Sequence, residues 1–504
     1  MSSADRSPTE SANAPDRVEF AGWNLQHSYA RLPACMFQQV GPEPVKQPEV
    51  VLVNDRLADE LGMDFHGIES SQLAAWFSGN DLPPGASPIA QAYAGHQYGH
   101  FTMLGDGRAV LLGEQVGPMQ QVWDVQLKGS GPTAFSRRGD GRAALGPMLR
   151  EYIISEAMEA LGIPTTRSLA VVATGEPVYR ETILPGAILV RVASSHIRVG
   201  TFEYAVRRDV DALTQLAEYT IQRHFPSIPA GDDRFLRLLQ AVLQQQTALV
   251  AAWMHVGFLH GVLNTDNVSI AGETIDYGPC AFMNAYDPAT VFSSIDHGGR
   301  YAFGNQPAIM QWNLMRFAET LLPLIADGAD EAVKQAGEVL ETFPAQVQQA
   351  WKAGMQAKLG LPVLDVADEP SQALIDDLLQ WMQANDADYT NTFRDLSEPH
   401  GLTDAVYQDA SFQAWHARWR GVVGEAPKAI AEAQQRMREV NPAVIPRNHL
   451  VEQALSAATL HGDLQPLLGL LAVLNRPFET PVNTKAYCDA PPDGDQGYRT
   501  FCGT

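Results

Sequence analysis

The segment from His260 to Gly278 contains the residues best suited to chemistry. It reads His-Gly-Val-Leu-Asn-Thr-Asp-Asn from His260 to Asn267, and Asp276 opens an Asp-Tyr-Gly triplet nine residues later. Asn267 and Asp276 carry the hard oxygen atoms that magnesium prefers. Asp266 adjoins Asn267, so its carboxylate could take a proton close to a bound metal. A buried polar network around His260 is the alternative interpretation.

The spacing matches a protein-kinase catalytic loop that lacks one residue. A kinase loop reads H-R-D-L-x-x-x-N, in which the Asp accepts the substrate proton and the Asn holds magnesium. Val262 stands at the position of that Asp, and Asp266 supplies an acidic group elsewhere. The chain is therefore either catalytically inactive or carries out different chemistry on ATP.

Earlier segments carry groups that could bind phosphates. Residues 105–108 (Gly-Asp-Gly-Arg) could be a glycine loop whose N–H groups approach phosphate, although a plain hairpin turn has the same pattern. Lys128 ends an alternating strand, and Glu151 lies 23 residues later on an expected helix. An ion pair between the two would orient the Lys toward phosphate oxygens. For either residue alone, a structural role is the simpler interpretation.

Arginines are concentrated in the same region. Eight Arg and one Lys lie between Lys128 and Arg198, whereas the whole chain has a net charge of −23. Residues 137–142 (Arg-Arg-Gly-Asp-Gly-Arg) precede the expected helix, and anions favour helix N-termini. Arg191 and Arg198 could each hold a phosphate in bidentate fashion. Together these residues predict a polyanion pocket.

The elements that would position these groups are mainly β from about Arg108 to residue 205. The run that ends at Lys128 alternates polar and apolar residues, and Gly162 and Pro164 end the expected helix. This order of elements is that of a kinase N-lobe. In chain order we expect strands at 108–116 and 122–128, a helix at 143–161, and strands at 168–173 and 187–193.

The chain is mainly helical after residue 205. Phe235, Leu238, Val242, Leu249 and Trp253 recur at helical intervals on a segment that leads into the His260 loop. Further helices are expected at 308–326, 328–358, 370–384, 402–417, 425–439, 447–459 and 465–474.

The predicted fold class is α+β, with a kinase-like bilobal arrangement of a small β-rich lobe and a larger helical lobe. Five parts are expected along the chain: a disordered tail at 1–17, an N-terminal extension at 18–100, a kinase-like N-lobe at 101–200, a kinase-like C-lobe with the catalytic loop at 201–370, and a helical C-terminal extension at 371–504.

Composition limits the location and the partners. The acidic balance of 58 Asp and Glu against 35 Lys and Arg disfavours nucleic acid and anionic membranes as partners. The first seventeen residues have no apolar core of a signal peptide, and the uncharged run 238–265 is interrupted by polar residues. We expect a cytoplasmic protein.

Two histidines at His96 and His100 have the i, i+4 spacing of zinc ligands on a helix. Gly95 and Gly99 make a helix poor there, and no third ligand is evident nearby. Metal binding by this pair is therefore the less favoured interpretation.

These residues stand in longer motifs that resemble the selenoprotein O family, the YdiU group of bacteria, from about residue 20 to the C-terminus. The resemblance implies a kinase-like fold that transfers AMP from ATP to protein hydroxyls. ATP would bind in a flipped orientation that exposes its α-phosphate. The motifs are A-G-H-Q-Y-G-H-F, G-D-G-R, Q-L-K-G-S-G-P-T, R-x-G-D-G-R, H-G-V-L-N-T-D-N, I-D-Y-G-P and N-P-A-V-I-P-R-N-H.

The resemblance also implies roles for individual residues. Asp266 would be the proton acceptor, and Glu151 the ion-pair partner of Lys128. Asn267 and Asp276 would bind magnesium, with manganese as an alternative. The implied nucleotide-binding residues are Gly105, Gly107, Arg108, Lys128, Asp140, Gly141, Arg191, Arg198 and Asp276.

The cysteines form no C-x-x-C pair and no zinc spacing. Cys502 lies in a polar tail, open to redox chemistry, where some relatives carry selenocysteine. In some relatives that residue pairs with a Cys after D-Y-G-P. Here the only Cys near that segment is Cys280, directly after the motif. Farther along the segment the chain carries Phe292, which has no thiol. A regulatory disulfide of Cys502 is thus left open.

Three functions are compatible with these motifs. The favoured one is a protein adenylyltransferase that moves AMP to Ser, Thr or Tyr hydroxyls and releases pyrophosphate, with UTP as an alternative donor. The second is an atypical kinase that transfers the γ-phosphate, and the third is a pseudokinase scaffold that only binds ATP. Expected partners are protein substrates, the chain itself included.

Overall fold

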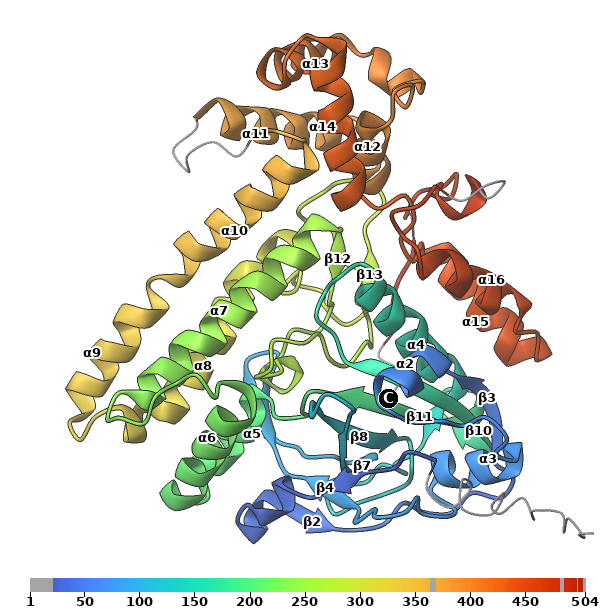
Figure 1. The fold of residues 1–504 in the computed structure, drawn as a ribbon, viewed down its shortest axis with the longest axis vertical. Helices are drawn as coiled ribbons and strands as arrows, with labels where there is room; N and C mark the ends of the chain where they lie inside the picture. Colours follow the sequence, from blue (N-terminus) through green and yellow to red (C-terminus); the bar gives the residue numbers. More distant parts are fainter. Residues whose placement is uncertain (1–20, 363–368, 481–484, 496, 502–504) are drawn as a thin grey trace, which may run out of the picture.

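The computed structural model describes residues 21–362, 369–480, 485–495 and 497–501. It confirms an α+β protein with a β-sheet region and a larger helical region (Figure 1). The disordered tail expected at 1–17 lies outside the described residues. None of the described helices is long and apolar enough to cross a membrane.

Within the described residues, nine strands form one antiparallel sheet in the order β2-β4-β7-β8-β11-β10-β3, with β1 paired to β7 and β9 to β11. Two small hairpins, β5–β6 and β12–β13, lie outside it. The strands are β1 (Leu25–Gln26), β2 (Phe37–Gln39), β3 (Glu49–Val53), β4 (Ile89–Gln91), β5 (Ala94–Gln97), β6 (His100–Met103), β7 (Ala109–Val116), β8 (Val122–Lys128), β9 (Ala143–Ala144), β10 (Arg167–Tyr179), β11 (Ile183–Ala193), β12 (Phe258–Leu259) and β13 (Ala281–Phe282).

Some of the helices pack against the sheet, and the others form the larger helical region. They are α2 (Asp55–Glu60), α3 (Ser70–Ser78), α4 (Leu145–Ala160), α5 (Val199–Ala205), α6 (Val210–His224), α7 (Arg234–His255), α8 (Gln306–Ile325), α9 (Ala329–Leu340), α10 (Phe343–Lys358), α11 (Glu369–Ala384), α12 (Tyr389–Ser397), α13 (Ala410–Val423), α14 (Pro427–Val440), α15 (Asn448–His461) and α16 (Gln465–Leu474).

Strand alternation decides which side chains of the central sheet face the site. Val125 and Leu127 of β8 pack in one apolar cluster with α2 and α3. Because successive residues of a strand point to opposite faces, Gln126 and Lys128 point to the other face, where α4 packs. Arg191 of the neighbouring β11 alternates with Val190 in the same way.

Helix α4 begins two residues later than expected, because Ala143 and Ala144 pair with β11 as β9 instead. It ends as expected, with Gly162 in the left-handed conformation at φ 75°. Strands β10 and β11 are longer than the expected 168–173 and 187–193 and form a long hairpin.

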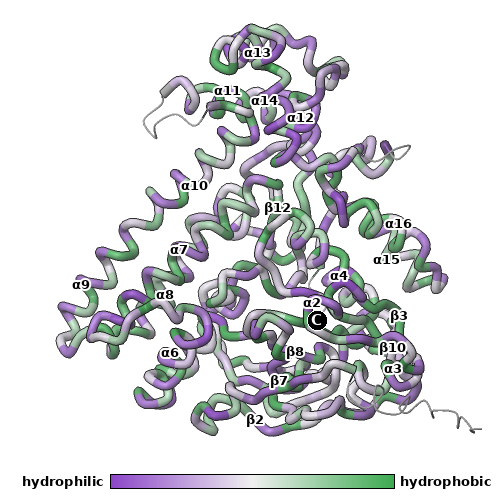
Figure 2. The backbone as a smooth tube through the Cα atoms, viewed as in Figure 1, coloured by the Kyte–Doolittle hydropathy of each residue, from purple (hydrophilic) through white to green (hydrophobic). Residues whose placement is uncertain are grey.

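The helical region follows the apolar periodicity of the sequence. The expected stripe on α7 is buried, and hydrophobic and hydrophilic segments alternate along α7, α9 and α10 (Figure 2). The prediction of a single helix at 328–358 is wrong, because a turn at 341–342 separates α9 from α10. Pro344 explains the break, since proline lacks an N–H and tolerates only the first turn of a helix.

The expected helix at 402–417 also differs from the structure. A short 3₁₀ turn covers Ala405–Gln408, and α13 begins only at Ala410. Asp409 causes this start, because its carboxylate accepts the N–H groups of Ser411 and Phe412 as an N-cap.

The C-terminal elements return to the sheet region. Helices α15 and α16 lie beside α4 (Figure 1). The chain then passes the Asp-Tyr-Gly segment, where Thr500 Oγ1 donates to the Pro279 carbonyl and its N–H donates to the Phe292 carbonyl. Cys502 lies outside the described residues.

Candidate active site

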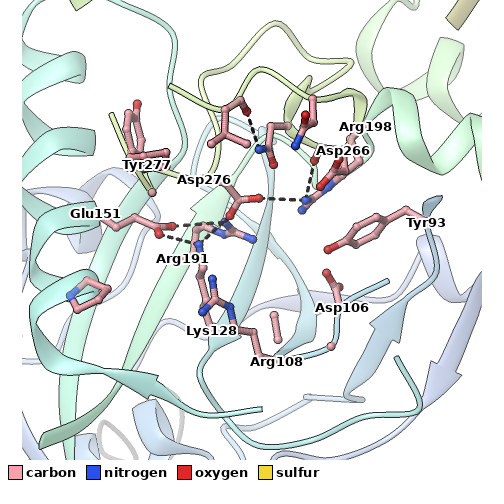
Figure 3. Close-up of a pocket in the computed structure, with 18 of the residues that line it drawn as sticks. Tyr93, Asp106, Arg108, Lys128, Glu151, Arg191, Arg198, Asp266, Asp276 and Tyr277 are labelled. Atoms are coloured by element: carbon pink, nitrogen blue, oxygen red, sulfur yellow. Dashed lines mark hydrogen bonds and ion pairs between the residues drawn. The ribbon is translucent and has the colours of Figure 1, made fainter. Parts of the chain in front are cut away.

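A cavity of about 200 Å³ lies where the sheet meets the loop that runs from Val262 to Pro279. Figure 3 shows Lys128, Glu151 and Arg191 on one side of it, with Asp276 at its centre. Asp266 and Arg198 approach from the other side. The structure thus brings together groups that are up to 148 residues apart in the chain.

Lys128 on β8 and Arg191 on β11 line the cavity from the sheet. Lys128 Nζ lies 2.6 Å from Glu151 Oε2 and 2.7 Å from Asp276 Oδ1. Arg191 Nη1 lies 2.5 Å from Asp276 Oδ1 and 3.3 Å from Glu151 Oε1. The other terminal nitrogen of Arg191, Nη2, donates a hydrogen bond to Gln126 Oε1 at 2.6 Å, which fixes the plane of the guanidinium.

Arg198 is the third buried cation. Its Nη1 donates to Asp276 Oδ2 at 3.1 Å and to the Asp266 carbonyl at 3.0 Å. The Tyr93 ring lies under its guanidinium at 4.4 Å. Its Nη2 is buried and has no hydrogen-bond partner among the described residues. This cation therefore retains one free donor for an anion.

Asp276 is the point on which all three cations converge. Its backbone has a φ of 63°, an uncommon conformation for a residue with a side chain. Burial opposes its ionisation, but the charges of Lys128, Arg191 and Arg198 hold the pKa of Asp276 well below its usual range. The carboxylate is thus anionic and offers hard oxygen atoms.

Asp266 differs from Asp276 because its pKa is raised and not lowered. Burial raises the pKa of Asp266 to about 6. Gln97 Nε2 approaches its Oδ2 at 3.3 Å, whereas Oδ1 is buried without a partner in the part of the chain that the structure describes. A Cβ atom on Gly95 would lie 2.6 Å from Oδ1, so only glycine leaves this oxygen room.

The β5–β6 hairpin holds the loop that carries Asp266. The His96 N–H donates to Thr265 Oγ1 at 2.7 Å, and Thr265 donates to Glu203 at 2.6 Å. His96 Nδ1 bonds the same Glu203, and the Tyr98 N–H donates to Asn264 at 3.0 Å. These hydrogen bonds join segments that are distant in the chain, and through them the β5–β6 hairpin holds the loop in place.

The zinc interpretation of His96 and His100 finds no support in this geometry. The two residues lie on opposite strands of a hairpin, with His96 opposite Phe101 and His100 opposite Gln97. Across the described ranges, no group of three His, Cys, Asp or Glu side chains is arranged to hold a metal. A metal at the cavity would therefore need the Asp276 carboxylate, the Asn267 amide oxygen and further oxygens that a nucleotide brings.

His260 and Asn267 stand at the two ends of the loop segment 260–267. Asn267 Nδ2 donates to the Val262 carbonyl at 2.8 Å, which leaves its Oδ1 for another partner. His260 Nε2 lies 3.0 Å from the Ile275 carbonyl, and burial lowers the pKa of His260. His260 is thus a neutral residue that ties the loop to the Asp276 segment.

A second cavity of about 290 Å³ adjoins the first, and Tyr93, Gln97, Gly107, Arg108 and Asp266 line both. Its wall includes Gly105 and the 139–142 turn. Gly105 has a φ of 116° and its Cα faces the Phe135 ring, so a side chain here would be strained and would clash. The glycine loop is thus also a packing feature.

Asp140 and Gly141 belong to this outer cavity. Asp140 is exposed and pairs with Arg180 at 2.8 Å, and this hydrogen-bonded ion pair lowers the pKa of Asp140. All nucleotide-binding residues expected from the sequence line one of the two cavities. Cys280, by contrast, is a buried free thiol whose pKa burial raises to about 12.

Four further residues of the site have no assigned role from the sequence: Tyr93, Gln97, Asp106 and Glu203. Burial raises the pKa of Asp106 to about 6, and this carboxylate accepts a hydrogen bond from Gln126 at 3.0 Å. Gln97 and Asp106 lie inside the A-G-H-Q-Y-G-H-F and G-D-G-R motifs, so these motifs were the signal that could have indicated them as site residues. Glu203 lies on a helix with no such signal.

Comparisons with known proteins identify the family to which the chain is similar. Residues 19–475 match the family model described as "Protein adenylyltransferase SelO". A relative from Syntrophotalea carbinolica, named "Protein nucleotidyltransferase YdiU", is 56% identical over 484 residues, which cover 96% of this chain and 98% of the relative.

Other bacterial relatives carry the same name. The protein from Brevibacillus brevis is 54% identical, with 96% of this chain and 98% of the relative covered. The protein from Halalkalibacterium halodurans is 54% identical over 500 residues, with 98% of this chain and the whole of the relative covered.

Proposed function

The chain belongs to the SelO family of protein adenylyltransferases, and we propose that it transfers AMP from ATP to Ser, Thr or Tyr hydroxyls with Asp266 as the base. The protein is a nucleotidyltransferase with a nucleotide as substrate. The acceptor residues, the roles of the site residues and the metal are parts of the proposal.

The kinase-like arrangement belongs to this proposal as well. It is supported by an antiparallel sheet whose strand Lys128 pairs with Glu151 on α4. A helical region follows, and its first long helix, α7, leads into the loop with Asn267 and Asp276. In kinases the equivalent pair and metal ligands surround the triphosphate.

The two cavities suggest how ATP would bind. The inner cavity holds Lys128, Arg191 and Arg198, and it suits the β- and γ-phosphates because these carry most of the negative charge. The outer cavity, with Asp140 and Gly141, would hold the nucleoside. The α-phosphate would then lie between the two, beside Asp266.

The position of Asp266 carries the proposal. It lines both cavities, and its Oδ1 has no partner among the described residues. A raised pKa near 6 leaves this carboxyl mostly ionised at neutral pH yet more basic than an exposed Asp. It can therefore take the proton of a hydroxyl that approaches the α-phosphate.

Asn267 and Asp276 fit a magnesium ion, since both line the inner cavity with oxygen donors and Asp276 is anionic. A bound magnesium or manganese ion would neutralise phosphate charge. Asp276 would then exchange its contacts with Lys128, Arg191 and Arg198 for the metal, and the phosphates would take over the three cations.

The reaction balances with these residues. The acceptor oxygen forms a bond to the α-phosphorus, and its proton moves to Asp266. The bond from the α-phosphorus to the oxygen that bridges to the β-phosphate breaks, and pyrophosphate leaves with the electron pair. Lys128, Arg191 and Arg198 stabilise the charge that develops on pyrophosphate, because they already point to that region.

Intact-mass spectrometry after incubation with ATP and magnesium tests the proposal. A gain of one AMP on an added acceptor protein, or on the chain itself, is the expected result. A gain of one phosphate would instead indicate a kinase, and no gain on any acceptor would indicate a scaffold. Parallel reactions with UTP and with manganese determine the preferred donor and metal.

A further inference from the structure

A contiguous group of aromatic and cationic side chains lies on the outer side of the β5–β6 hairpin. The Arg207 guanidinium lies 3.8 Å above the Phe101 ring, and Arg300 and Arg316 lie 4.9 and 5.2 Å from the Trp312 ring. The His96 ring touches both Phe101 and Trp312 edge-on. We define Phe101, Arg207, Arg300, Trp312 and Arg316 as the cation–aromatic patch.

The patch is positive within an acidic protein. Arg316 pairs with Glu319 at 2.6 Å. In the described part of the chain, neither Arg207 nor Arg300 has a carboxylate partner; Arg207 donates to the Glu203 carbonyl, and Arg300 Nε is buried without a partner. With a net charge of −23, most of this chain would repel an acidic polypeptide, and these cations would attract it locally.

Strand β6 supplies a route from the patch to the site. Among the described strands it pairs only with β5, so one edge of it is open. Phe101 and Met103 on it are 36% and 40% exposed. The next residue, Leu104, lines the outer cavity that Asp266 also lines. An extended segment beside β6 would therefore be led toward Asp266.

We propose that the cation–aromatic patch binds an acidic, extended segment of the acceptor protein and presents its hydroxyl residue to Asp266. This inference rests on the proposed function, because it assumes that the site modifies proteins. The specificity it assigns is Asp or Glu close to the modified residue, with the cations recognising the carboxylates and the rings packing against the chain.

Peptide binding tests the inference without requiring transfer. The probes are two fluorescein-labelled peptides with one Tyr each, flanked by Glu in one and by Lys in the other, and the full-length protein is titrated into each. Fluorescence anisotropy should show binding of the Glu peptide that weakens with added salt, and at least about tenfold weaker binding of the Lys peptide.

Substitutions locate the contact. The double substitution Arg207→Ala/Arg300→Ala, and separately Arg207→Glu, should weaken binding of the Glu peptide about tenfold or more. Arg418→Ala, which removes an exposed cation on α13, should change nothing and serves as the matched control. A thermal shift with ATP, retained in each variant, shows that the variants are folded.

Binding and transfer fail separately in this design. Asp266→Asn should keep the Glu peptide bound while it loses AMP transfer. Equal binding of the two peptides, absence of binding, or unchanged binding in both patch variants would overturn the inference even if AMP transfer occurs. Normal Glu-peptide binding by a wild-type protein that transfers no AMP to any acceptor would refute the proposed function and leave the patch as a docking surface.

Discussion

At the scale of residues, the site contains two buried carboxylates in opposite settings. Asp276 is surrounded by three cations that keep its pKa low, whereas burial raises the pKa of Asp266 to about 6. Such a separation within one cavity is typical of an acid–base pair with divided roles. Here Asp276 is suited to the role of a permanent anion that binds metal, and Asp266 is suited to the role of a proton acceptor.

Asp266→Asn should abolish transfer and leave ATP binding largely intact. The amide keeps the shape of the side chain but cannot take a proton, so a loss of about 10²-fold or more in kcat is expected. Calorimetric titration with ATP and magnesium gives the binding constant, and labelled AMP incorporation gives the rate. Transfer at the wild-type rate would remove Asp266 from the role of base.

Gly95→Ala tests the space that the hairpin leaves for Asp266. The added Cβ would lie 2.6 Å from Oδ1, so the carboxylate or the loop must move. We expect transfer to fall at least about tenfold, because small displacements of a reacting group are costly. Gly337→Ala on α9, where a Cβ meets nothing within 4 Å, is the control and should retain full activity.

At the scale of elements, strand alternation explains why part of the site could be predicted. Lys128 and Glu151 were assigned from a strand and a helix, and the structure places them 2.6 Å apart because β8 and α4 pack on one face. The β5–β6 hairpin could not be assigned in this way. Its contacts to Thr265 and Asp266 join segments 169 residues apart, and no local pattern encodes them.

Helix boundaries show the same limit. The periodicity of 328–358 is continuous, and only the turn chemistry around Pro344 separates α9 from α10. Gln97 and Asp106 lay within recognised motifs, but their roles depend on burial beside partners from other strands. Burial of this kind is a property of the assembled sheet.

Glu273 links the end of β11 to the segment before Asp276, and it makes that junction sensitive to pH. Its carboxylate accepts the N–H and hydroxyl of Ser194, and burial raises the pKa of Glu273 from 4.5 to about 7. The folded protein thus binds this proton more tightly than the unfolded chain. The stabilisation is complete below about pH 4.5 and is lost as the pH rises through about 7.

Denaturant unfolding at several pH values measures this effect. Relative to Glu273→Gln, the wild-type protein should lose on the order of 2 kcal/mol of unfolding free energy between about pH 5 and pH 8. Groups that titrate in both proteins cancel in the difference. A difference that is constant over this range would contradict the assignment.

At the scale of the whole molecule, one buried arginine joins the C-terminal elements to the centre. Arg447 donates to Asn284 at 2.6 Å, to Asp388 at 2.7 Å and to the Cys488 carbonyl at 2.6 Å. These partners come from the segment after β13, the N-cap of α12 and the chain that follows α16. A single side chain therefore fixes three segments.

Arg447→Ala should lower the free energy of unfolding by about 3–5 kcal/mol, because it leaves Asp388 partly buried without its cation. Chemical denaturation measures the change. Arg476→Ala removes an exposed ion pair to Glu479 and should cost under about 1 kcal/mol. Similar losses in the two variants would show that Arg447 is not a structural junction.

Parallel reactions with α-labelled and γ-labelled ATP decide whether this molecule moves AMP or phosphate. Each reaction contains the full-length protein, magnesium and a protein acceptor, and the label that becomes covalently bound to protein is counted. We expect covalent label from the α position alone, and loss of that label in Asp266→Asn. Label from the γ position, or from neither, would show that the molecule does not transfer AMP.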